Sequence, residues 1–233
     1  IIANALTFAG SGATLNIDAA TTCSGAFTMS NNAIFDIANG ITLTKTGSGI
    51  ACAEKNLQFI GADGGTLANS GGALTFSTGT LNADMSVTIS GAITISGNTT
   101  FDIASGKTIT YSAASISVGA NVLTIQNGTF NNTNAINLET ATSKITITGA
   151  TVNKVSKITT DATSTSILVS TASTITTFTH GFDSIIDLGA NLTITDSFNV
   201  GALTLTLTGT GQLTGGIITL DQSNSILKRT DAG

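Results

Sequence analysis

The chain has 233 residues and a formal net charge of −5, and only 9% of its residues are charged, whereas about a quarter of an ordinary soluble domain is charged. The Lys and Arg residues are scattered, which excludes a nucleic-acid partner because phosphate binding needs clustered cations. No run of about eighteen apolar residues occurs, so no transmembrane segment is expected.

Short strands are predicted along the whole chain. Apolar residues alternate with Thr, Ser or Asn, which is the two-residue period of a strand, and Gly, Asn and Ser favour turns between the runs. The predicted strands are 6–8, 14–17, 26–30, 34–37, 41–45, 56–60, 73–77, 87–90, 93–96, 100–103, 108–112, 115–118, 122–126, 135–138, 144–148, 151–155, 166–169, 173–178, 185–188, 192–195, 203–207, 217–220 and 225–227. No helical period interrupts them.

An internal duplication organises these strands. The segment Ser24–Thr44, SGAFTMSNNAIFDIANGITLT, returns sixty-six residues later as Ser90–Thr110, SGAITISGNTTFDIASGKTIT. The duplication covers about residues 5–60 and 73–126, and a fainter third copy lies at 186–195. A repeat of this length divides into three coils of about twenty-two residues, each with three short strands.

This arithmetic predicts an all-β fold, a single elongated parallel β-solenoid (β-helix) of about ten short coils that includes residues 1–233. An antiparallel sandwich of immunoglobulin type is the alternative, but it usually has longer strands, a few prolines and a core Trp, and this chain lacks both Pro and Trp. Phe35 and Phe101 are equivalent in the repeat and are expected to stack inside. The equivalent Asp36, Asp102 and Asp187 are interpreted as solvated residues, because copies three coils apart are roughly 14 Å apart and cannot share one ion.

The two cysteines, Cys23 and Cys52, correspond in the repeat to Ile89 and Val118, so both are expected to face the core. Two alternatives follow from this position. They are two buried reduced thiols, or they form one disulfide across the interior if the protein is exported. The only histidine, His180, is far away in sequence, so we expect no zinc site, no other metal and no cofactor.

One group of residues, His180, Asp183 and Asp187, has acid–base potential. Cleavage of a polysaccharide would need two carboxylates at a defined separation across a groove walled by loops, and the turns here are short. No GxSxG elbow, phosphate-binding loop or paired Cys and His nucleophile occurs. We therefore expect no catalytic residue and no enzymatic activity.

Four Asn-x-Ser/Thr sequons, at Asn98, Asn127, Asn131 and Asn191, are possible glycosylation sites. A chain so rich in Asn and Thr contains about that many by composition alone. They would carry glycans only in a cell that glycosylates exported proteins.

Pairs of threonines separated by one residue suggest an ice-binding surface, in which ladders of Thr order water. The pairs begin at Thr42, Thr108, Thr146, Thr193 and Thr204. Their spacings do not reduce to one coil length, so the pairs are expected on different faces. Ice binding is therefore kept as a remote alternative.

The repeated short strands, the Gly and Asn turns, the neutral Thr-rich faces and segments such as LTLTLTG at Leu203–Gly209 resemble the β-solenoid parts of bacterial autotransporter adhesins and filamentous surface proteins. The resemblance implies an exported, non-enzymatic protein that is extracellular or at the cell surface. The chain begins with Ile1 rather than Met, which favours a mature or excised segment.

A solenoid has an unpaired strand edge at each end, which must be capped or paired. No capping helix is predicted, and the N-terminal residues Ile1, Ile2, Ala3, Asn4, Ala5 and Leu6 are uncharged. We therefore expect a self-assembling fibre or surface-layer subunit, a homopolymer in which this strand adds to a neighbouring subunit. The alternative is an adhesive β-helical stalk, an autotransporter passenger or phage fibre segment, that binds a cell-surface glycan or protein.

Overall fold

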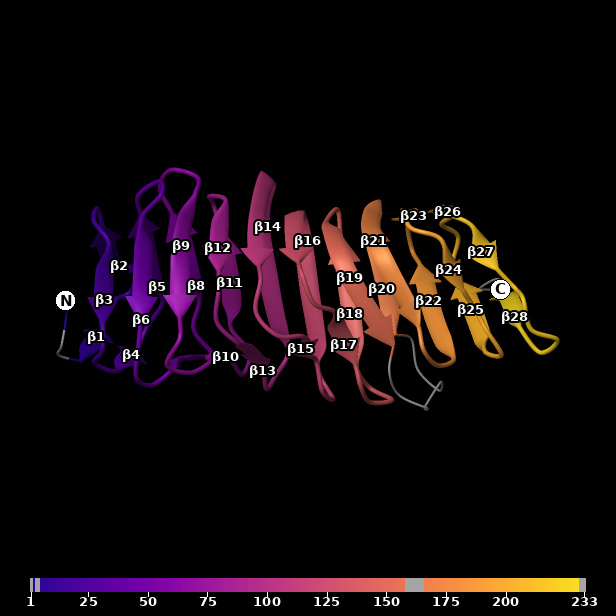
Figure 1. Ribbon diagram of the computed structural model, residues 1–233, viewed down its shortest axis with the longest axis horizontal. Helices are drawn as coiled ribbons and strands as arrows, with labels where there is room; N and C mark the ends of the chain where they lie inside the picture. The colour runs from indigo at the N-terminus through magenta and orange to yellow at the C-terminus, as the bar shows by residue number, and fades with distance from the viewer. Residues whose placement is uncertain (1, 3–4, 158–165, 231–233) are drawn as a thin grey trace.

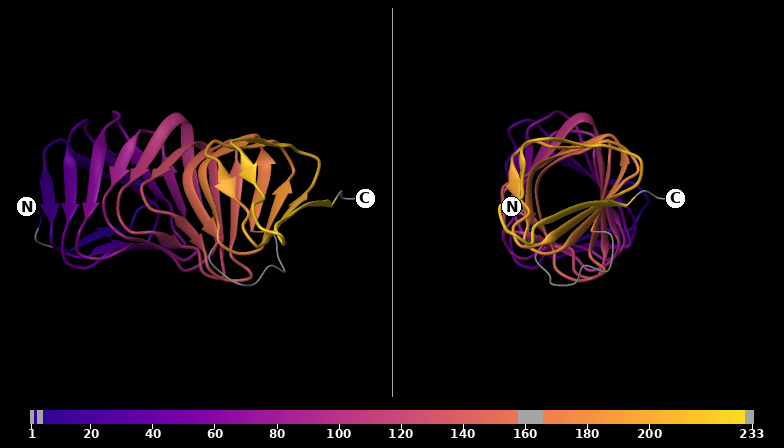
Figure 2. Two further views of the ribbon diagram at one scale, coloured as in Figure 1. Left: turned by 45° about the vertical axis from the view of Figure 1, so that its right-hand side comes forward. Right: turned by 90° about the vertical axis from the view of Figure 1, so that its right-hand side faces the viewer.

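The computed structural model, which describes residues 2, 5–157 and 166–230, is an elongated β-solenoid of about ten turns (Figure 1). Its strands are stacked in parallel and lie across the long axis, and the two termini lie at opposite ends. Viewed along that axis, the chain winds round one common centre (Figure 2). No helix occurs in the described ranges. The predicted parallel β-solenoid is therefore confirmed.

Most turns contribute one strand to each of three faces, which we call A, B and C. Face A contains β2 (Ala13–Ile17), β5 (Ala33–Ile37), β8 (Leu57–Ile60), β11 (Thr80–Ala83), the first halves of β14 (Thr99–Tyr111) and β16 (Val122–Asn132), β18 (Lys144–Thr148), β20 (Ile167–Thr171), β22 (Ser184–Leu188), β25 (Thr204–Thr208) and β28 (Ile226–Thr230). Face B contains β3 (Thr21–Cys23), β6 (Thr42–Lys45), β9 (Gly65–Asn69), β12 (Val87–Ile89), the second halves of β14 and β16, the first parts of β19 (Thr151–Lys157) and β21 (Ser173–His180), β23 (Leu192–Ile194) and β26 (Leu213–Gly215). Face C contains β1 (Leu6–Phe8), β4 (Phe27–Met29), β7 (Ile50–Ala53), β10 (Leu74–Phe76), β13 (Ile93–Ile95), β15 (Ile116–Ser117), β17 (Ile136–Leu138), the ends of β19 and β21, β24 (Phe198–Asn199) and β27 (Ile218–Thr219).

The two-residue alternation of the sequence separates the core from the surface. In β5, Ala33, Phe35 and Ile37 are fully buried, while Ile34 and Asp36 between them are half-buried on the outside. The same alternation in successive turns places one apolar side chain above another and forms a continuous core along the axis. Burial of these side chains is the main favourable contribution to the stability of the solenoid.

The stacking on face A differs from the expected repeat. Phe101 pairs with Leu81, Leu81 with Leu57, and Leu57 with Ala33. Phe35 therefore lies in the neighbouring column, two residues further along its strand, although both phenylalanines are fully buried. The prediction that both side chains are inside is confirmed. The prediction that they are equivalent in the stack is wrong, because the repeat offset in the sequence is two residues shorter than three turns of the solenoid on this face.

The turns differ in length because the corners between faces absorb the difference. On face B, Thr42 pairs with Thr66, twenty-four residues on, whereas Thr174 pairs with Thr193, nineteen residues on. Corners use residues with positive φ, such as Gly40 and the non-glycine Asn127, which permit a sharp change of direction.

The Thr-x-Thr pairs are consequently less dispersed than their sequence spacings suggest. Those that begin at Thr42, Thr108 and Thr193 all lie on face B, and those at Thr146 and Thr204 lie on face A. The expectation that unequal spacing separates the pairs is therefore only partly correct.

Candidate functional site

The C-terminal turn exposes apolar side chains. The large hydrophobic residues that are most exposed in the described part of the chain are Ile217, Leu220, Ile226 and Leu227, and all four lie in this turn. Ile217 is 72% exposed and Leu227 is 41% exposed. A concentration of exposed apolar residues in one place indicates a surface that contacts another molecule.

The last strand of face A, β28, has one free edge. Among the described residues it pairs with β25 alone, with Leu227 opposite the buried Leu205. The Ile226 N–H donates to the Leu203 carbonyl at 3.0 Å, so the alternation of a parallel strand directs the N–H of Leu227 away from β25. Both a main-chain donor and an inward-pointing apolar side chain are thus available at this end for a further strand.

The N-terminal end presents the complementary edges. β1, β2 and β3 each pair with the next turn on one side, through β4, β5 and β6. Figure 2 shows that these first strands and the last ones lie at opposite ends of the same stack. A further parallel strand can therefore add at the C-terminal end and beside β1 and β2 without a change of direction, whereas Ile2 already bridges the outer edge of β3 at Cys23.

The predicted subunit-joining strand is not a free arm. Ile2 forms a bridge with Cys23, its N–H donating to the Thr22 carbonyl at 2.8 Å, and the Leu6 N–H donates to the Ala26 carbonyl at 2.9 Å. Ala5 is exposed beside β1. Ile1, Ala3 and Asn4 lie outside the described residues. Ile2 and Leu6 already belong to the first turn, so a joint at this end would use the outer edge of that turn.

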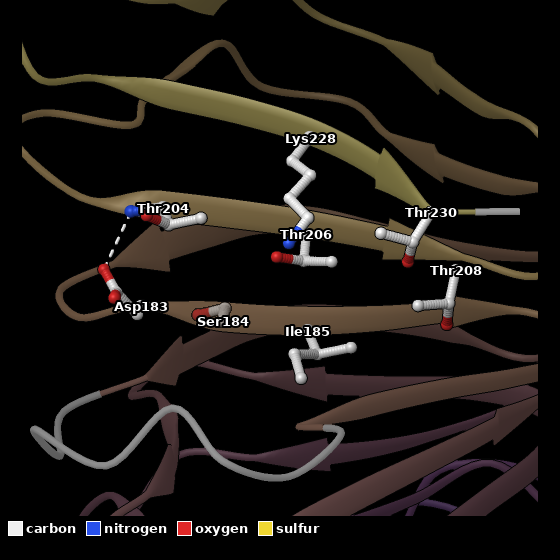
Figure 3. Close-up of a pocket in the computed structure, with 8 residues that line it drawn as sticks. All are labelled: Asp183, Ser184, Ile185, Thr204, Thr206, Thr208, Lys228 and Thr230. Carbon is white, nitrogen blue, oxygen red and sulfur yellow. Dashed lines mark hydrogen bonds between the residues drawn. The ribbon is translucent and has the colours of Figure 1, made fainter.

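A shallow groove lies on face A close to the exposed end (Figure 3). Its volume is about 380 Å³, and β22, β25 and β28 supply its lining residues, Asp183, Ser184, Ile185, Thr204, Thr206, Thr208, Lys228 and Thr230. Asp183 Oδ1 accepts a hydrogen bond from the Thr204 N–H at 2.7 Å, which joins two turns. The groove thus contains one carboxylate that already accepts a main-chain hydrogen bond, the amine of Lys228, and threonines around them.

The residues with acid–base potential do not form a cluster. His180 is buried and stacks on Phe178 with ring centroids 5.9 Å apart, whereas Asp187 lies at an outward position of β22. Burial lowers the pKa of His180 to about 4, and the nearby Asp183 opposes this shift. Neither ring nitrogen has a hydrogen-bond partner within the described residues.

The three repeated aspartates lie in three different columns of face A. Asp36 pairs with Asn16 and Ile60, Asp102 with Asn82 and Gln126, and Asp187 with Leu168 and Thr208. They form no carboxylate row. No group of three or more His, Cys, Asp or Glu residues that could hold a metal ion is found in the ranges that the structure describes.

Both cysteines are fully buried, as predicted, and both are free thiols. Cys23 belongs to β3 on face B and Cys52 to β7 on face C. The disulfide stays a prediction. Burial raises the pKa of Cys52 to about 12. Burial also raises the pKa of Cys23, and the neighbouring Lys45 opposes the shift.

The fully buried Lys45 is a cation in the interior. Its ammonium donates to the carbonyls of Thr46 and Ser48 at 2.6 and 2.7 Å and lies 5.5 Å from the ring centre of Phe27. These contacts replace the water that the charge loses on burial. Lys45 is therefore a structural residue of the turn.

The four sequon asparagines hold neighbouring turns together. Asn98 and Asn191 accept hydrogen bonds from the main-chain N–H groups of Val122 and Gln212, at 2.9 and 3.0 Å. Asn127 donates to Asp102 at 2.8 Å, and Asn131 accepts from Asn153. Asn98, Asn127 and Asn191 are exposed, and Asn131 is half-buried. Their glycosylation stays a prediction.

No family model, no curated protein and no solved structure matches the chain. Within the described residues, no helix has the length and apolar character needed to cross a membrane. The features that distinguish the molecule are therefore the exposed end of the stack and the composition of its faces.

The sequence interpretation missed the exposed C-terminal end. The available signal was the cluster of apolar residues Ile217, Ile218 and Leu220, which the sequence pattern predicts to be a strand like any other. Alternation indicates which side chains point inward but not whether another turn covers them.

Proposed function

We propose that this protein is a non-enzymatic, extracellular structural subunit that assembles end to end into a fibre or surface layer. The observation that carries the proposal is the exposed C-terminal turn, with Leu227 pointing inward at an unpaired edge. The first turn of a second copy, β1 to β3, has the parallel direction needed to continue each face. Main-chain pairing and apolar burial would then stabilise the joint together.

Composition favours a structural role. Only 9% of the residues are charged. Among the described residues, the groove on face A is not lined by a buried acid–base pair. The faces are lined by Thr, Ser and Asn, which suit a long neutral assembly. The cell surface is the location that agrees with the resemblance to filamentous surface proteins.

Electron microscopy of the purified chain with a Leu227→Pro variant tests the proposal. The wild type should form filaments or sheets. The variant should remain as single short rods, because proline removes the Leu227 N–H that points away from β25 and is available to a further strand. Leu227→Val is the matched control, since it retains both the N–H and an apolar side chain. Dispersed rods of the wild type at high concentration, or unchanged filaments of a folded Leu227→Pro variant, would reject end-to-end assembly.

Removal of residues 1–6 tests the opposite end. Deletion takes away Ile2 and Leu6, which complete the first turn, and should abolish filaments while circular dichroism still reports strands. Filaments that form normally without these residues would exclude this edge as the joint. The adhesive stalk is the second candidate, favoured by the groove on β22, β25 and β28.

A further inference from the structure

Six threonines form an unbroken column on the outside of face B. Each pairs with the next in consecutive turns from β14 to β26, in the order Thr108, Thr129, Thr151, Thr174, Thr193 and Thr214. None is buried. We call this the first threonine column. Its members are separated by nineteen to twenty-three residues in sequence, so only the register of the turns reveals it.

A second column runs beside it, two residues further along each strand. Its first four members are Thr42, Thr66, Thr88 and Thr110, each paired with the next. It continues through Asn131, Asn153, Thr176 and Thr195. From β14 to β23 the two columns together present Thr or Asn at every position, without a charged or aromatic side chain.

The hydroxyl groups of the first four members of the first column are available to water. Among the described residues, the hydroxyls of Thr108, Thr129, Thr151 and Thr174 form no hydrogen bond with another protein group, whereas Thr193 and Thr214 bond to one another at 3.1 Å. The main chain beneath them is held by parallel pairing on both sides. The free hydroxyls are thus attached to a rigid sheet.

Parallel strands place the outward side chains of the two columns on a two-dimensional lattice, in which the second column has hydroxyls at Thr110, Thr176 and Thr195 and amides at Asn131 and Asn153. Neighbouring members of a column are about 4.8 Å apart, and members of the two columns on one strand are about 6.6 Å apart. Oxygen atoms on the surfaces of hexagonal ice repeat on the same length scale. Water molecules bound to neighbouring threonines are therefore spaced as neighbouring oxygen atoms of an ice surface are spaced.

We propose that face B, along the two columns from β14 to β23, is an ice-binding surface. Each bound water contributes little, but a rigid array engages many at once and loses little conformational entropy, so the combined attachment to a crystal is strong. Growth of ice between attached molecules is then impeded. The inference does not rest on end-to-end assembly.

The composition of the columns distinguishes ice from other flat ligands. Sugar rings prefer to stack on aromatic side chains, and this surface has none. Face A has a shorter threonine column, formed by Thr80, Thr100, Thr124 and Thr146. Leu168 and Asp187 follow Thr146 in the next two turns and end this threonine column. The column beside it contains Asp102 and Gln126. A charged and uneven neighbour disrupts ordered water, so face A is the natural control.

Thr151→Tyr and Thr124→Tyr form a matched pair of variants. Both residues are half-buried, outward-facing threonines within a threonine column, on faces B and A respectively. A tyrosine suits an exposed strand position and keeps a hydroxyl. The bulky tyrosine ring should block contact with a flat ice crystal on face B, where ice is proposed to bind. The same ring on face A should have no effect on ice binding.

The measurements are thermal hysteresis, which is the gap between the melting and freezing temperatures of the protein solution, the shape of ice crystals grown in it, and the inhibition of ice recrystallisation. The wild type should show all three effects, Thr151→Tyr should lose most of each, and Thr124→Tyr should match the wild type. Circular dichroism confirms that both variants keep their strands. A wild type without any effect on ice, a folded Thr151→Tyr variant that is as active as the wild type, or equal losses in both variants would overturn the proposal.

Discussion

Phe101 stands in the same column as Ala33, three turns away, and not in the column of Phe35, its counterpart in the duplicated sequence. Its ring contacts Phe76 and Phe130, with centroids 6.2 and 5.2 Å away. Leu57 and Leu81 separate Ala33 from Phe101 in this column, whereas Phe35 and Phe59 are direct neighbours in the column beside it. The core is therefore filled by local fit between adjacent turns rather than by exact repetition.

Replacement of Phe101 by alanine should destabilise the solenoid by about 3–5 kcal/mol, because it leaves a cavity between two fixed turns. Denaturant unfolding measures the loss. Phe198→Ala is the control, since Phe198 is only partly buried near the C-terminal end and should cost less. Equal costs for the two variants would contradict the packing described here.

Gly97 lies at the corner between faces C and A, close to the main chain of the preceding turn at Ser77. A Cβ atom built at this position would overlap the main-chain oxygen of Ser77. Gly97→Ala should therefore lower the free energy of unfolding by about 1–3 kcal/mol or more. Gly10→Ala should have little effect, because a Cβ atom there has no neighbour within 4 Å. Thermal unfolding of both variants compares the two sites, and a neutral Gly97→Ala would disprove the close approach.

The two thiols should resist alkylation in the native protein. Cys52 is fully buried and its pKa is raised to about 12, so it has almost no thiolate at neutral pH. Intact-mass measurement should show no adduct under native conditions and two adducts after denaturation without reductant. An absence of adducts in denatured, unreduced protein would instead establish the disulfide.

Acidification should weaken the fold through His180. Its pKa of about 4 in the folded state lies below the ordinary value of 6.5, so the unfolded chain binds more protons between these pH values. Stability should therefore fall as the pH drops from about 6.5 to about 4, by at most about 3 kcal/mol.

Urea unfolding at a series of pH values measures this dependence. His180→Phe should remove it while it retains the stacking on Phe178, and Asp183→Asn reports the contribution of the opposing carboxylate. A wild type and a His180→Phe variant with the same pH dependence would exclude His180 as its source.

The sequence by itself determined most of the strands and the direction of their side chains, although the predicted ranges missed strands such as β3, β7, β9 and β11. A two-residue period is a local property, so Phe35 and Phe101 could be placed inside from their neighbours alone, whereas Cys23 and Cys52 were placed inside through their repeat counterparts Ile89 and Val118. The absence of proline and the duplicated segment were sufficient to favour a parallel solenoid. These inferences needed no knowledge of how one turn meets the next.

Only the tertiary structure decided which residues share a column. The corners vary in length, so a sequence offset does not translate into a fixed position in the stack, as Phe101 and Ala33 demonstrate. The same variation hid the column from Thr108 to Thr214. The exposure of Leu227 was hidden because alternation does not show whether another turn covers a strand. Register and coverage depend on main-chain pairing between turns some twenty residues apart, and that pairing is decided when the turns pack together.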